Sequence, residues 1–195
     1  LLNRNKLVAR NNIIVIGIST GGPQVLRHLF EGVPKLNASI LLVQHMPKWI
    51  NESMRKTLDA STDMDVLIAE DGAVLKPATI YVAPSTLHME VINNSSIRLY
   101  EAPKVCFVCP SIDITMASIV KSRKKIAAVV LTGIGKDGAN GLAHVKKIGG
   151  VTFAQDKASS TIYGMPQAAA NTGCVDFVAP PSQIVQHLVQ HFGEA

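Results

Sequence analysis

The chain has 195 residues, the size of one domain, and 47% of them are hydrophobic against 17% charged, which excludes an intrinsically disordered chain. A net charge of +5 is too small an excess for a polybasic nucleic-acid-binding arm. No apolar run approaches the roughly 18 residues of a membrane-spanning helix, so we expect neither nucleic-acid binding nor membrane insertion.

The cysteine content bears on the compartment of the protein. Three cysteines, an odd number, argue against a secreted disulfide scaffold and are typical of the reducing cytoplasm, where we expect this chain to be. Residues 1–11 begin with the basic segment Leu-Leu-Asn-Arg-Asn-Lys, and we interpret them as an N-terminal extension or the remnant of a linker. Residues 12–195 contain no convincing linker or repeat and are predicted to form one domain.

The first third of the chain alternates between apolar runs and amphipathic stretches. Residues 13–17 and 39–44 are rich in Val, Ile and Leu, and such continuous hydrophobicity is typical of strands covered on both faces. Residues 22–32 and 47–60 place their apolar side chains at helical spacing, and the second stretch opens with proline. Two consecutive strand–helix pairs are therefore predicted.

The middle of the chain has a different pattern. Short alternating segments at residues 79–83, 87–92 and 97–101 predict strands. The tetrapeptide Asn93-Asn94-Ser95-Ser96 between the last two is typical of a hairpin turn. We therefore expect an antiparallel hairpin at one edge of an otherwise parallel sheet.

The rest of the chain returns to the first pattern. A helix is predicted from Ser111 through Ser122, with Asp113 in its first turn, where a negative charge suits the helix dipole. Further strands are predicted at residues 127–132 and 151–155, and further helices at residues 141–148, 166–171 and 182–192. The predicted fold class is α/β, with a doubly wound, mainly parallel sheet and helices on both faces.

The residues that follow each strand are the candidates for chemistry, because ligands of open α/β sheets gather beyond the carboxyl ends of the strands. The segment Gly17-x-Ser19-x-Gly21 follows the first strand and matches the nucleophile-elbow pattern. His45 follows the second strand, and Asp137 follows the strand at residues 127–132. A hydroxyl, an imidazole and a carboxylate are the three parts of an activated serine, so these residues form a candidate triad.

Each member of this triad also has a structural interpretation. Glycine and serine fill ordinary strand–helix turns, and a histidine at a strand end often bonds a nearby carbonyl group. Asp137 could be the N-cap of the helix that follows it, a role that is compatible with catalysis. The other candidates for the base are His28, His88 and His144.

A second motif points to a different function. The segment Gly133-x-Gly135-x-x-Gly138 follows a strand and opens a helix, as a dinucleotide-binding fingerprint does, and Asp156 lies about 20 residues further on, where a ribose-binding acid is expected. The charge of Asp137 opposes this interpretation, because it lies in the loop that would hold pyrophosphate. A Rossmann-type dinucleotide-binding protein is the alternative to the hydrolase.

Two further pairs of residues were considered as redox or metal sites. Cys106-x-x-Cys109 lies just before a predicted helix, which leaves a thioredoxin-like role open, although a zinc site would need a second pair of ligands. His187 and His191 are spaced as a metal-binding pair, but the sequence offers no evident third ligand. We expect no metal and no organic cofactor.

Five motifs together resemble the catalytic domain of the chemotaxis protein-glutamate methylesterase (CheB) family, in order and from about residue 12 to residue 192. The motifs are Ile16-Gly17-Ile18-Ser19-Thr20-Gly21-Gly22, Gln44-His45-Met46-Pro47, Tyr81-Val82-Ala83-Pro84, Leu131-Thr132-Gly133-Ile134-Gly135-Lys136-Asp137-Gly138 and Tyr163-Gly164-Met165-Pro166.

The resemblance implies a serine hydrolase that removes methyl esters from glutamate side chains of chemoreceptors, and many members also deamidate receptor glutamines. It implies Ser19 as the nucleophile, His45 as the base and Asp137 as the residue that orients the base. The backbone near Thr20 and Ile134 is then implied as the oxyanion site. Residues 12–195 would be the methylesterase catalytic domain.

The resemblance also implies partners. The substrate would be the cytoplasmic helices of methyl-accepting chemoreceptors. Members of the family usually carry a receiver domain ahead of the catalytic domain, and this chain does not contain one. Relatives often have an Arg-Pro pair where this chain has Cys109-Pro110, which bears on the choice of substrate.

Overall fold

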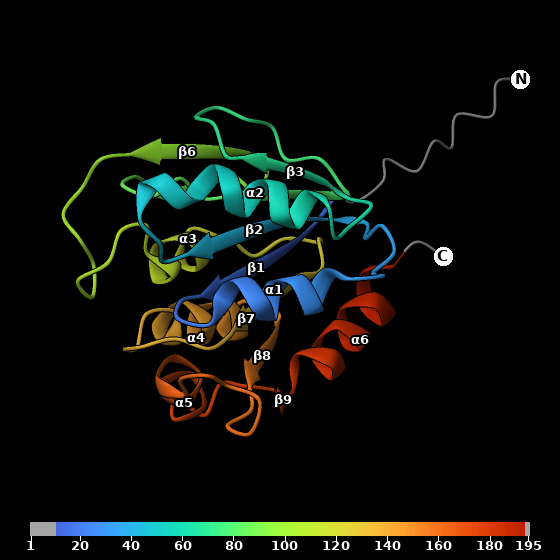
Figure 1. The fold of residues 1–195 in the computed structure, drawn as a ribbon, viewed down its shortest axis with the longest axis vertical. Coiled ribbons are helices and arrows are strands. Elements are labelled where there is room, and N and C mark those ends of the chain that lie inside the picture. The colour runs from blue at the N-terminus through green and yellow to red at the C-terminus, as the bar shows by residue number, and fades with distance from the viewer. Residues whose placement is uncertain (1–10, 194–195) are drawn as a thin grey trace, which may run out of the picture.

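A parallel sheet runs through the middle of the molecule (Figure 1). The computed structural model describes residues 11–193, and seven strands pair in the order β3-β4-β2-β1-β7-β8-β9, each parallel to its neighbours. The chain adds strands on one side of β1 before it crosses to the other, which confirms the predicted doubly wound sheet. The strands are β1 (Asn12–Ile18), β2 (Ala38–Gln44), β3 (Asp65–Ile68), β4 (Thr79–Val82), β7 (Ile126–Val130), β8 (Val151–Gln155) and β9 (Phe177–Ala179).

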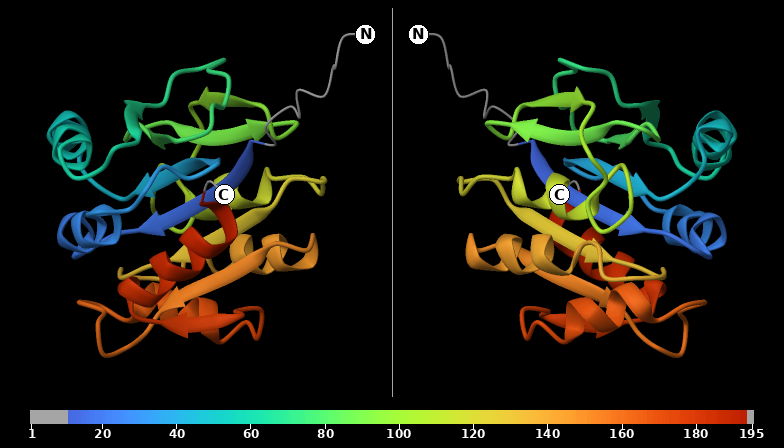
Figure 2. Two further views of the ribbon diagram at one scale, coloured as in Figure 1. Left: turned by 90° about the vertical axis from the view of Figure 1, so that its right-hand side faces the viewer. Right: turned by 90° about the vertical axis from the view of Figure 1, so that its left-hand side faces the viewer.

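Helices cover both faces of this sheet, as predicted (Figure 2). One face carries α1 (Gly22–Phe30), α2 (Asn51–Asp59) after a short turn of 3-10 helix at Lys48–Ile50, and α6 (Pro181–Phe192). The other face carries α3 (Ile112–Ala117), α4 (Ala139–Lys147) and α5 (Gly164–Ala170).

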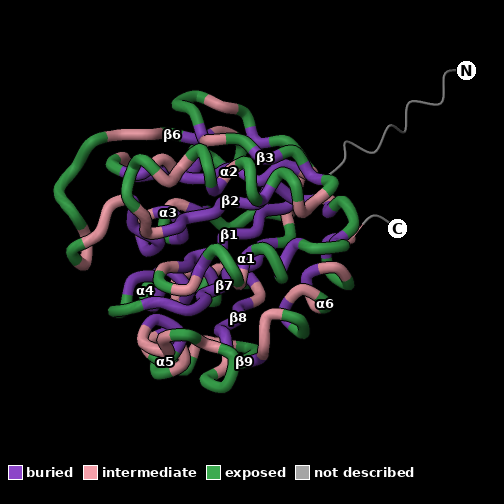
Figure 3. The backbone as a smooth tube through the Cα atoms, in the orientation of Figure 1, coloured by how far each residue is buried: buried purple, intermediate pink, exposed green. Residues whose placement is uncertain are grey.

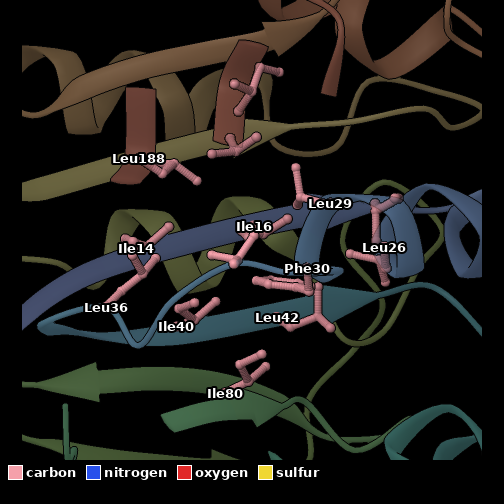
Figure 4. Packing of buried hydrophobic residues seen from close by; sticks show 14 of the residues in the cluster. Ile14, Ile16, Leu26, Leu29, Phe30, Leu36, Ile40, Leu42, Ile80 and Leu188 are labelled. Carbon is pink, nitrogen blue, oxygen red and sulfur yellow. The ribbon is translucent and has the colours of Figure 1, made fainter. Parts of the chain in front are cut away.

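The alternation of side chains along β1 builds two cores. Ile14 and Ile16 point to one face and pack with Leu26 and Phe30 of α1 (Figure 4). Ile13 and Val15 point to the other face and pack in the cluster that includes α3 and α4. Each fully buried Ile, Leu or Phe side chain contributes about 1.5–3 kcal/mol to stability. The central strands are therefore buried on both sides, as Figure 3 shows.

The predicted hairpin is present as a separate two-stranded antiparallel sheet. It consists of β5 (His88–Ile92) and β6 (Ser96–Tyr100). Its apolar side chains, Met89 and Ile97 among them, pack with Tyr81 of β4 on the face that α3 and α4 cover. The hairpin therefore takes the place of a helix on that face, near the β3–β4 edge of the main sheet.

The helix after Ser111 is shorter than predicted, because it ends at Ala117 rather than continuing to Ser122. The reason lies in the hairpin turn. The Asn94 side chain accepts a hydrogen bond from the Val120 N–H (3.1 Å) and donates one to the Val120 carbonyl oxygen (2.6 Å). These two bonds replace the helical hydrogen bonds that Val120 would otherwise make.

The two edge strands, β3 and β9, were not predicted. Both have only one well-buried residue, because an edge strand of this sheet is partly open to solvent. In β3, Val66 is buried between exposed Asp65 and exposed Leu67. Strand β9 has three residues, which are too few to show an alternation of apolar and polar side chains. The hydrophobic pattern that identifies the central strands is therefore missing at both edges.

The predicted N-terminal extension, residues 1–11, lies outside the described residues except for Asn11. The Asn11 amide donates to the Leu75 carbonyl oxygen (2.7 Å) and accepts from the Ser39 hydroxyl (3.0 Å), so it is held against the sheet. None of the helices between residues 11 and 193 has the length and apolar character of a membrane span.

Candidate active site

The loops after β1 and β2 are neighbours at the carboxyl edge of the sheet. Ile18, the last residue of β1, is paired with Gln44, the last residue of β2, so Ser19 and His45 follow adjacent strand ends. The Gln44 side-chain amide donates to the carbonyl oxygens of both Ser19 (3.0 Å) and His45 (3.1 Å). One buried side chain therefore holds the two loops together.

His45 and Asp137 form a hydrogen bond although they are 92 positions apart in the sequence. The distance between Nε2 of His45 and Oδ2 of Asp137 is 3.0 Å, and both side chains are largely buried. A carboxylate can only accept, so Nε2 carries the hydrogen, and Nδ1 of the neutral ring is left as an acceptor. Two of the three predicted triad members are therefore in contact.

The second contact of the predicted triad, between Ser19 and His45, is not formed. The Ser19 hydroxyl makes no hydrogen bond to any other residue within 11–193, including His45. The Ser19 backbone is nevertheless fixed, because its N–H donates to the Thr132 carbonyl oxygen (2.9 Å). Only rotation of the serine side chain is left free at this position.

Asp137 lies at the N-terminus of α3 and accepts three hydrogen bonds from it. The donors are the N–H of Ile112 (2.7 Å), the N–H of Asp113 (3.0 Å) and the Ser111 hydroxyl (2.9 Å). Burial raises the pKa of Asp137, but the bonds from His45 and from these N–H groups outweigh that effect and hold the pKa below its ordinary value. Asp137 is therefore a carboxylate at neutral pH.

The prediction that Asp137 caps its own helix is wrong. The N-cap of α4 is Gly138, and the carboxylate that satisfies this helix end belongs to Asp113. Oδ1 of Asp113 accepts from the N–H of Gly138 (2.9 Å) and the N–H of Gly141 (2.7 Å). Burial and the nearby charge of Asp137 raise the pKa of Asp113, while the bonds from these N–H groups oppose that rise.

This arrangement also disfavours the dinucleotide alternative. The N–H groups that would bind pyrophosphate at the start of α4 already donate to Asp113. Asp156, the candidate ribose-binding acid, is engaged locally and accepts from the N–H of Ser159 (3.0 Å). The glycine-rich loop therefore serves helix packing and the placement of Asp137.

Two glycines of the elbow serve different purposes. Gly21 adopts a φ of 85°, a left-handed conformation that few other residues tolerate. Gly17 is required by packing, because a Cβ atom there would lie 2.5 Å from the Ile112 side chain. At Gly133 a Cβ atom would lie 2.7 Å from Cβ of Ser19, which shows how closely the loop after β7 approaches the serine.

Thr20 and Ile134, the predicted oxyanion positions, lie on two loops that Thr132 joins. The Thr132 hydroxyl donates to the Thr20 carbonyl oxygen (2.9 Å) and accepts from the N–H of Ile162 (2.9 Å). Within residues 11–193, the backbone N–H groups of Thr20 and Ile134 donate to no protein acceptor. Both donors remain available to a ligand.

The other histidines considered as the base are engaged elsewhere. His88 is fully buried, and its Nδ1 accepts from the Ser111 N–H (3.2 Å) while Nε2 faces the Pro103 carbonyl oxygen (3.1 Å). His144 contacts the Ile119 carbonyl oxygen (2.8 Å), and exposed His28 lies 3.8 Å from Glu31.

The cysteine pair lies beside the site but does not have the properties of a redox pair. Burial raises the pKa of both Cys106 and Cys109, and the charges of Asp137 and Asp113 raise that of Cys106 further. A raised pKa disfavours the reactive thiolate. The turn at residues 105–108 lies at the rim of the site, because Ser111, three residues after it, donates to Asp137.

Large apolar side chains are exposed on this rim. Phe107, at the tip of the 105–108 turn, is 94% exposed, Trp49 is 81% exposed and Ile134 is 67% exposed. Each belongs to a segment on the side of the molecule where the carboxyl ends of β1, β2 and β7 lie (Figure 1). We refer to Trp49, Phe107 and Ile134 as the apolar rim.

Sequence analysis missed several polar residues that build the site. Gln44 and Thr132 are predicted as strand ends and lie within the family motifs, but their side chains are assigned no role from the sequence, although a buried polar residue at the end of an apolar run is a signal of a structural hydrogen bond. Ser111 and Asp113 were assigned to their own helix, and nothing in their spacing indicates that their partner is Asp137.

Comparisons with known proteins agree with this geometry. The family model described as CheB methylesterase matches residues 14–188. The protein-glutamate methylesterase/protein-glutamine glutaminase of Pyrococcus horikoshii is 44% identical over 183 residues, which are 91% of this chain and 50% of that protein. The protein of the same name from Clostridium acetobutylicum is 39% identical over 181 residues, which are 91% and 52% of the two chains.

A solved structure shares the whole fold. The crystal structure of the Thermotoga maritima CheB methylesterase catalytic domain matches with a TM-score of 0.85 and 36% identity, over 93% of this chain and 98% of that one. The chain spans about half the length of the curated relatives it matches. Since the family model covers most of the sequence and the solved domain matches almost end to end, the chain belongs to the CheB methylesterase family.

Proposed function

We propose that this chain hydrolyses the methyl esters of glutamate side chains on chemoreceptors, with Ser19 as nucleophile, His45 as base and Asp137 as the orienting carboxylate. The observation that carries the proposal is the hydrogen bond of 3.0 Å between His45 and a buried Asp137, next to the turn that bears Ser19. The printed names of the curated relatives support the same activity.

The reaction is an acyl transfer in two halves. The proposal requires rotation about the Cα–Cβ bond of Ser19 to bring its hydroxyl to Nδ1 of His45, a contact that in many enzymes tightens only when substrate binds. The serine oxygen attacks the ester carbonyl carbon while His45 takes its proton, and Asp137 stabilises the imidazolium. His45 then protonates the leaving methoxide, and methanol departs.

The second half uses the same groups in reverse. Water gives a proton to Nδ1 and attacks the acyl-serine, which releases a glutamate carboxylate and restores Ser19. The backbone N–H groups of Thr20 and Ile134 are the donors we propose for the oxyanion, each worth about 3 kcal/mol in the transition state. With a glutamine side chain, ammonia replaces methanol, so we extend the proposal to deamidation.

The proposed substrate is a helix of a chemoreceptor cytoplasmic domain. The apolar rim supports this choice, because exposed aromatic and aliphatic side chains around a site are suited to docking the surface of another protein. We propose that residues 12–195 form the catalytic domain and that it works in the cytoplasm.

The test is a methanol-release assay with methylated receptor membranes. Ser19→Ala should lower turnover by about 10⁴-fold or more, because a triad acts as a unit. Ser53→Ala, a change of an exposed serine on α2, is the matched control and should leave turnover unchanged. Undiminished methanol release by the Ser19 variant would refute the assignment.

A further inference from the structure

The N-terminus of α3 and the N-terminus of α4 are each bonded by a carboxylate that comes from the other helix or from a residue just before it. Asp137, which precedes α4, accepts from the first residues of α3, and Asp113, which belongs to α3, accepts from the N–H groups of Gly138 and Gly141 at the start of α4. The helices touch where this exchange occurs, since a Cβ atom on Gly141 would lie 2.6 Å from Cβ of Met116. Neither carboxylate can shift without disturbing the other helix.

Asp137 uses its full capacity as an acceptor. Oδ1 accepts from the Ser111 hydroxyl and the Asp113 N–H, and Oδ2 accepts from the Ile112 N–H and from His45. A carboxylate offers about four lone-pair positions, so every one has a donor. His45 therefore shares the charge of Asp137 with three other donors.

The backbone of Ser111 is fixed by a hydrogen bond to a buried histidine. Its own backbone N–H donates to Nδ1 of His88, which is fully buried and also faces the Pro103 carbonyl oxygen. Ser111 itself is fully buried. The hydroxyl is therefore presented to Asp137 in a fixed direction.

We propose that Ser111 and Asp113 are positioning residues that set, in opposite directions, how strongly Asp137 attracts a proton to His45. The Ser111 hydroxyl neutralises part of the charge of Asp137 and weakens this attraction. The carboxylate of Asp113 adds a second negative charge and strengthens it. The inference deepens the proposed function and rests on it for the catalytic meaning of His45.

Three other titratable groups, each from a different neighbouring segment, lie near Asp137 and do not oppose this assignment. Lys136 precedes Asp137 and is exposed to solvent, which screens its charge. Cys106 belongs to the 105–108 turn, and burial together with the charges of both carboxylates raises its pKa, so it is a neutral thiol at pH 7. His88 approaches from β5 and accepts a hydrogen bond at Nδ1, as a neutral ring does.

The experiment follows the titration of the His45 imidazole by NMR in the whole chain, with the resonance assigned by its loss in His45→Gln. Ser111→Ala should move the titration midpoint of His45 up by about 0.5–1 pH unit, because Asp137 loses a donor. Asp113→Asn keeps an acceptor oxygen for α4 but removes a charge, so the midpoint should move down by about 0.5 unit.

The matched control is Ser118→Ala at the C-cap of α3. Ser118 accepts from the Val91 N–H (2.8 Å) and donates to the Thr115 carbonyl oxygen (2.7 Å), but it does not touch Asp137. It should lower the thermal midpoint of unfolding without moving the titration. Ser111→Thr, which keeps a hydroxyl, should restore the midpoint of wild type.

Opposite shifts in Ser111→Ala and Asp113→Asn, reproduced in the acid limb of kcat/KM, support the inference. Shifts of the same sign, or none in folded variants, overturn it. The titration needs no substrate, so it reports on positioning even if the chain proves not to release methanol. Failure of the proposed function is seen separately, as turnover that survives Ser19→Ala.

Discussion

Asp137 is the residue on which the site converges. It receives hydrogen bonds from a neighbouring helix, from a serine hydroxyl and from His45, and it is 2% exposed. A buried carboxylate is stable only when such donors compensate for the water it has lost. The same donors that make burial tolerable also fix the direction from which Asp137 meets the imidazole.

The lowered pKa of Asp137 predicts a specific pH dependence of stability. Because the folded-state pKa lies below the ordinary value of 3.8, the stabilisation from Asp137 is fully present above that value and is lost as pH falls through the folded-state pKa. Asp137→Asn should lower the free energy of unfolding by about 1.5–3 kcal/mol at pH 7.

Urea denaturation between pH 7 and pH 3 measures this difference, with His45→Gln in both proteins so that protonation of the imidazole does not contribute. The loss of stability caused by Asp137→Asn in this background should stay constant down to about pH 4 and then become smaller. A loss that grows on acidification would mean that the folded state raises the pKa of this carboxyl group.

The sequence points to Ser19, His45 and Asp137 as candidate residues, but it does not show which side chains hold them in place. The three follow core strands, and position after a strand is visible in the pattern of apolar runs. Gln44, Ser111 and Asp113 act through contacts between segments dozens of residues apart. The misassigned cap shows the limit: sequence pairs Asp137 with the helix it precedes, whereas packing pairs it with α3.

Among the elements, the turn at residues 105–108 is the one most exposed at the rim. A backbone bridge between Val105 and Val108 closes it, and Cys106 and Phe107 both have positive φ, so the turn is defined by hydrogen bonds and directs Phe107 into solvent. A turn whose backbone is held in this way has little backbone entropy to lose on binding.

We therefore predict that Phe107→Ser weakens docking of a receptor without changing the chemistry. The value of kcat/KM for methylated receptor should fall roughly tenfold, which corresponds to about 1.4 kcal/mol of lost contact. Hydrolysis of a small soluble methyl ester should be unchanged. Equal losses of activity toward the receptor and toward the small ester would show that the turn supports the catalytic site instead of docking the receptor.

Val120→Ser is the control for that experiment. Val120 is also an exposed apolar residue, but it precedes β7. It therefore lies toward the amino ends of the strands, away from the candidate site at their carboxyl ends. Its substitution should leave both activities as they are in wild type.

Across the whole molecule, the two faces of the sheet have different relations to the site. Helices α3 and α4 supply the N-termini that hold Asp137, whereas α6 packs on the other face and makes none of the hydrogen bonds described for the site within residues 11–193. The doubly wound, mainly parallel character of the sheet was predictable from alternating apolar runs and helices. The edge strands and the position of the hairpin over one face depend on packing between segments, which the hydrophobic periodicity of the sequence does not indicate.

This asymmetry predicts that equivalent losses of core packing have unequal effects on activity. Leu188 of α6 and Met116 of α3 are both almost fully buried, and replacing either with Ala should lower the free energy of unfolding by about 2–5 kcal/mol. Leu188→Ala should keep the kcat of wild type at temperatures where it is folded, because α6 only stabilises the sheet.

Met116→Ala should also lower kcat, since Met116 packs where α3 meets α4, and a cavity there loosens the two carboxylates that those helices exchange. Denaturant titration gives the stability of each variant, and initial rates well below the unfolding transition give kcat. Equal kcat values at equal stability would mean that the position of Asp137 is insensitive to the packing of α3, and that its hydrogen bonds alone hold it.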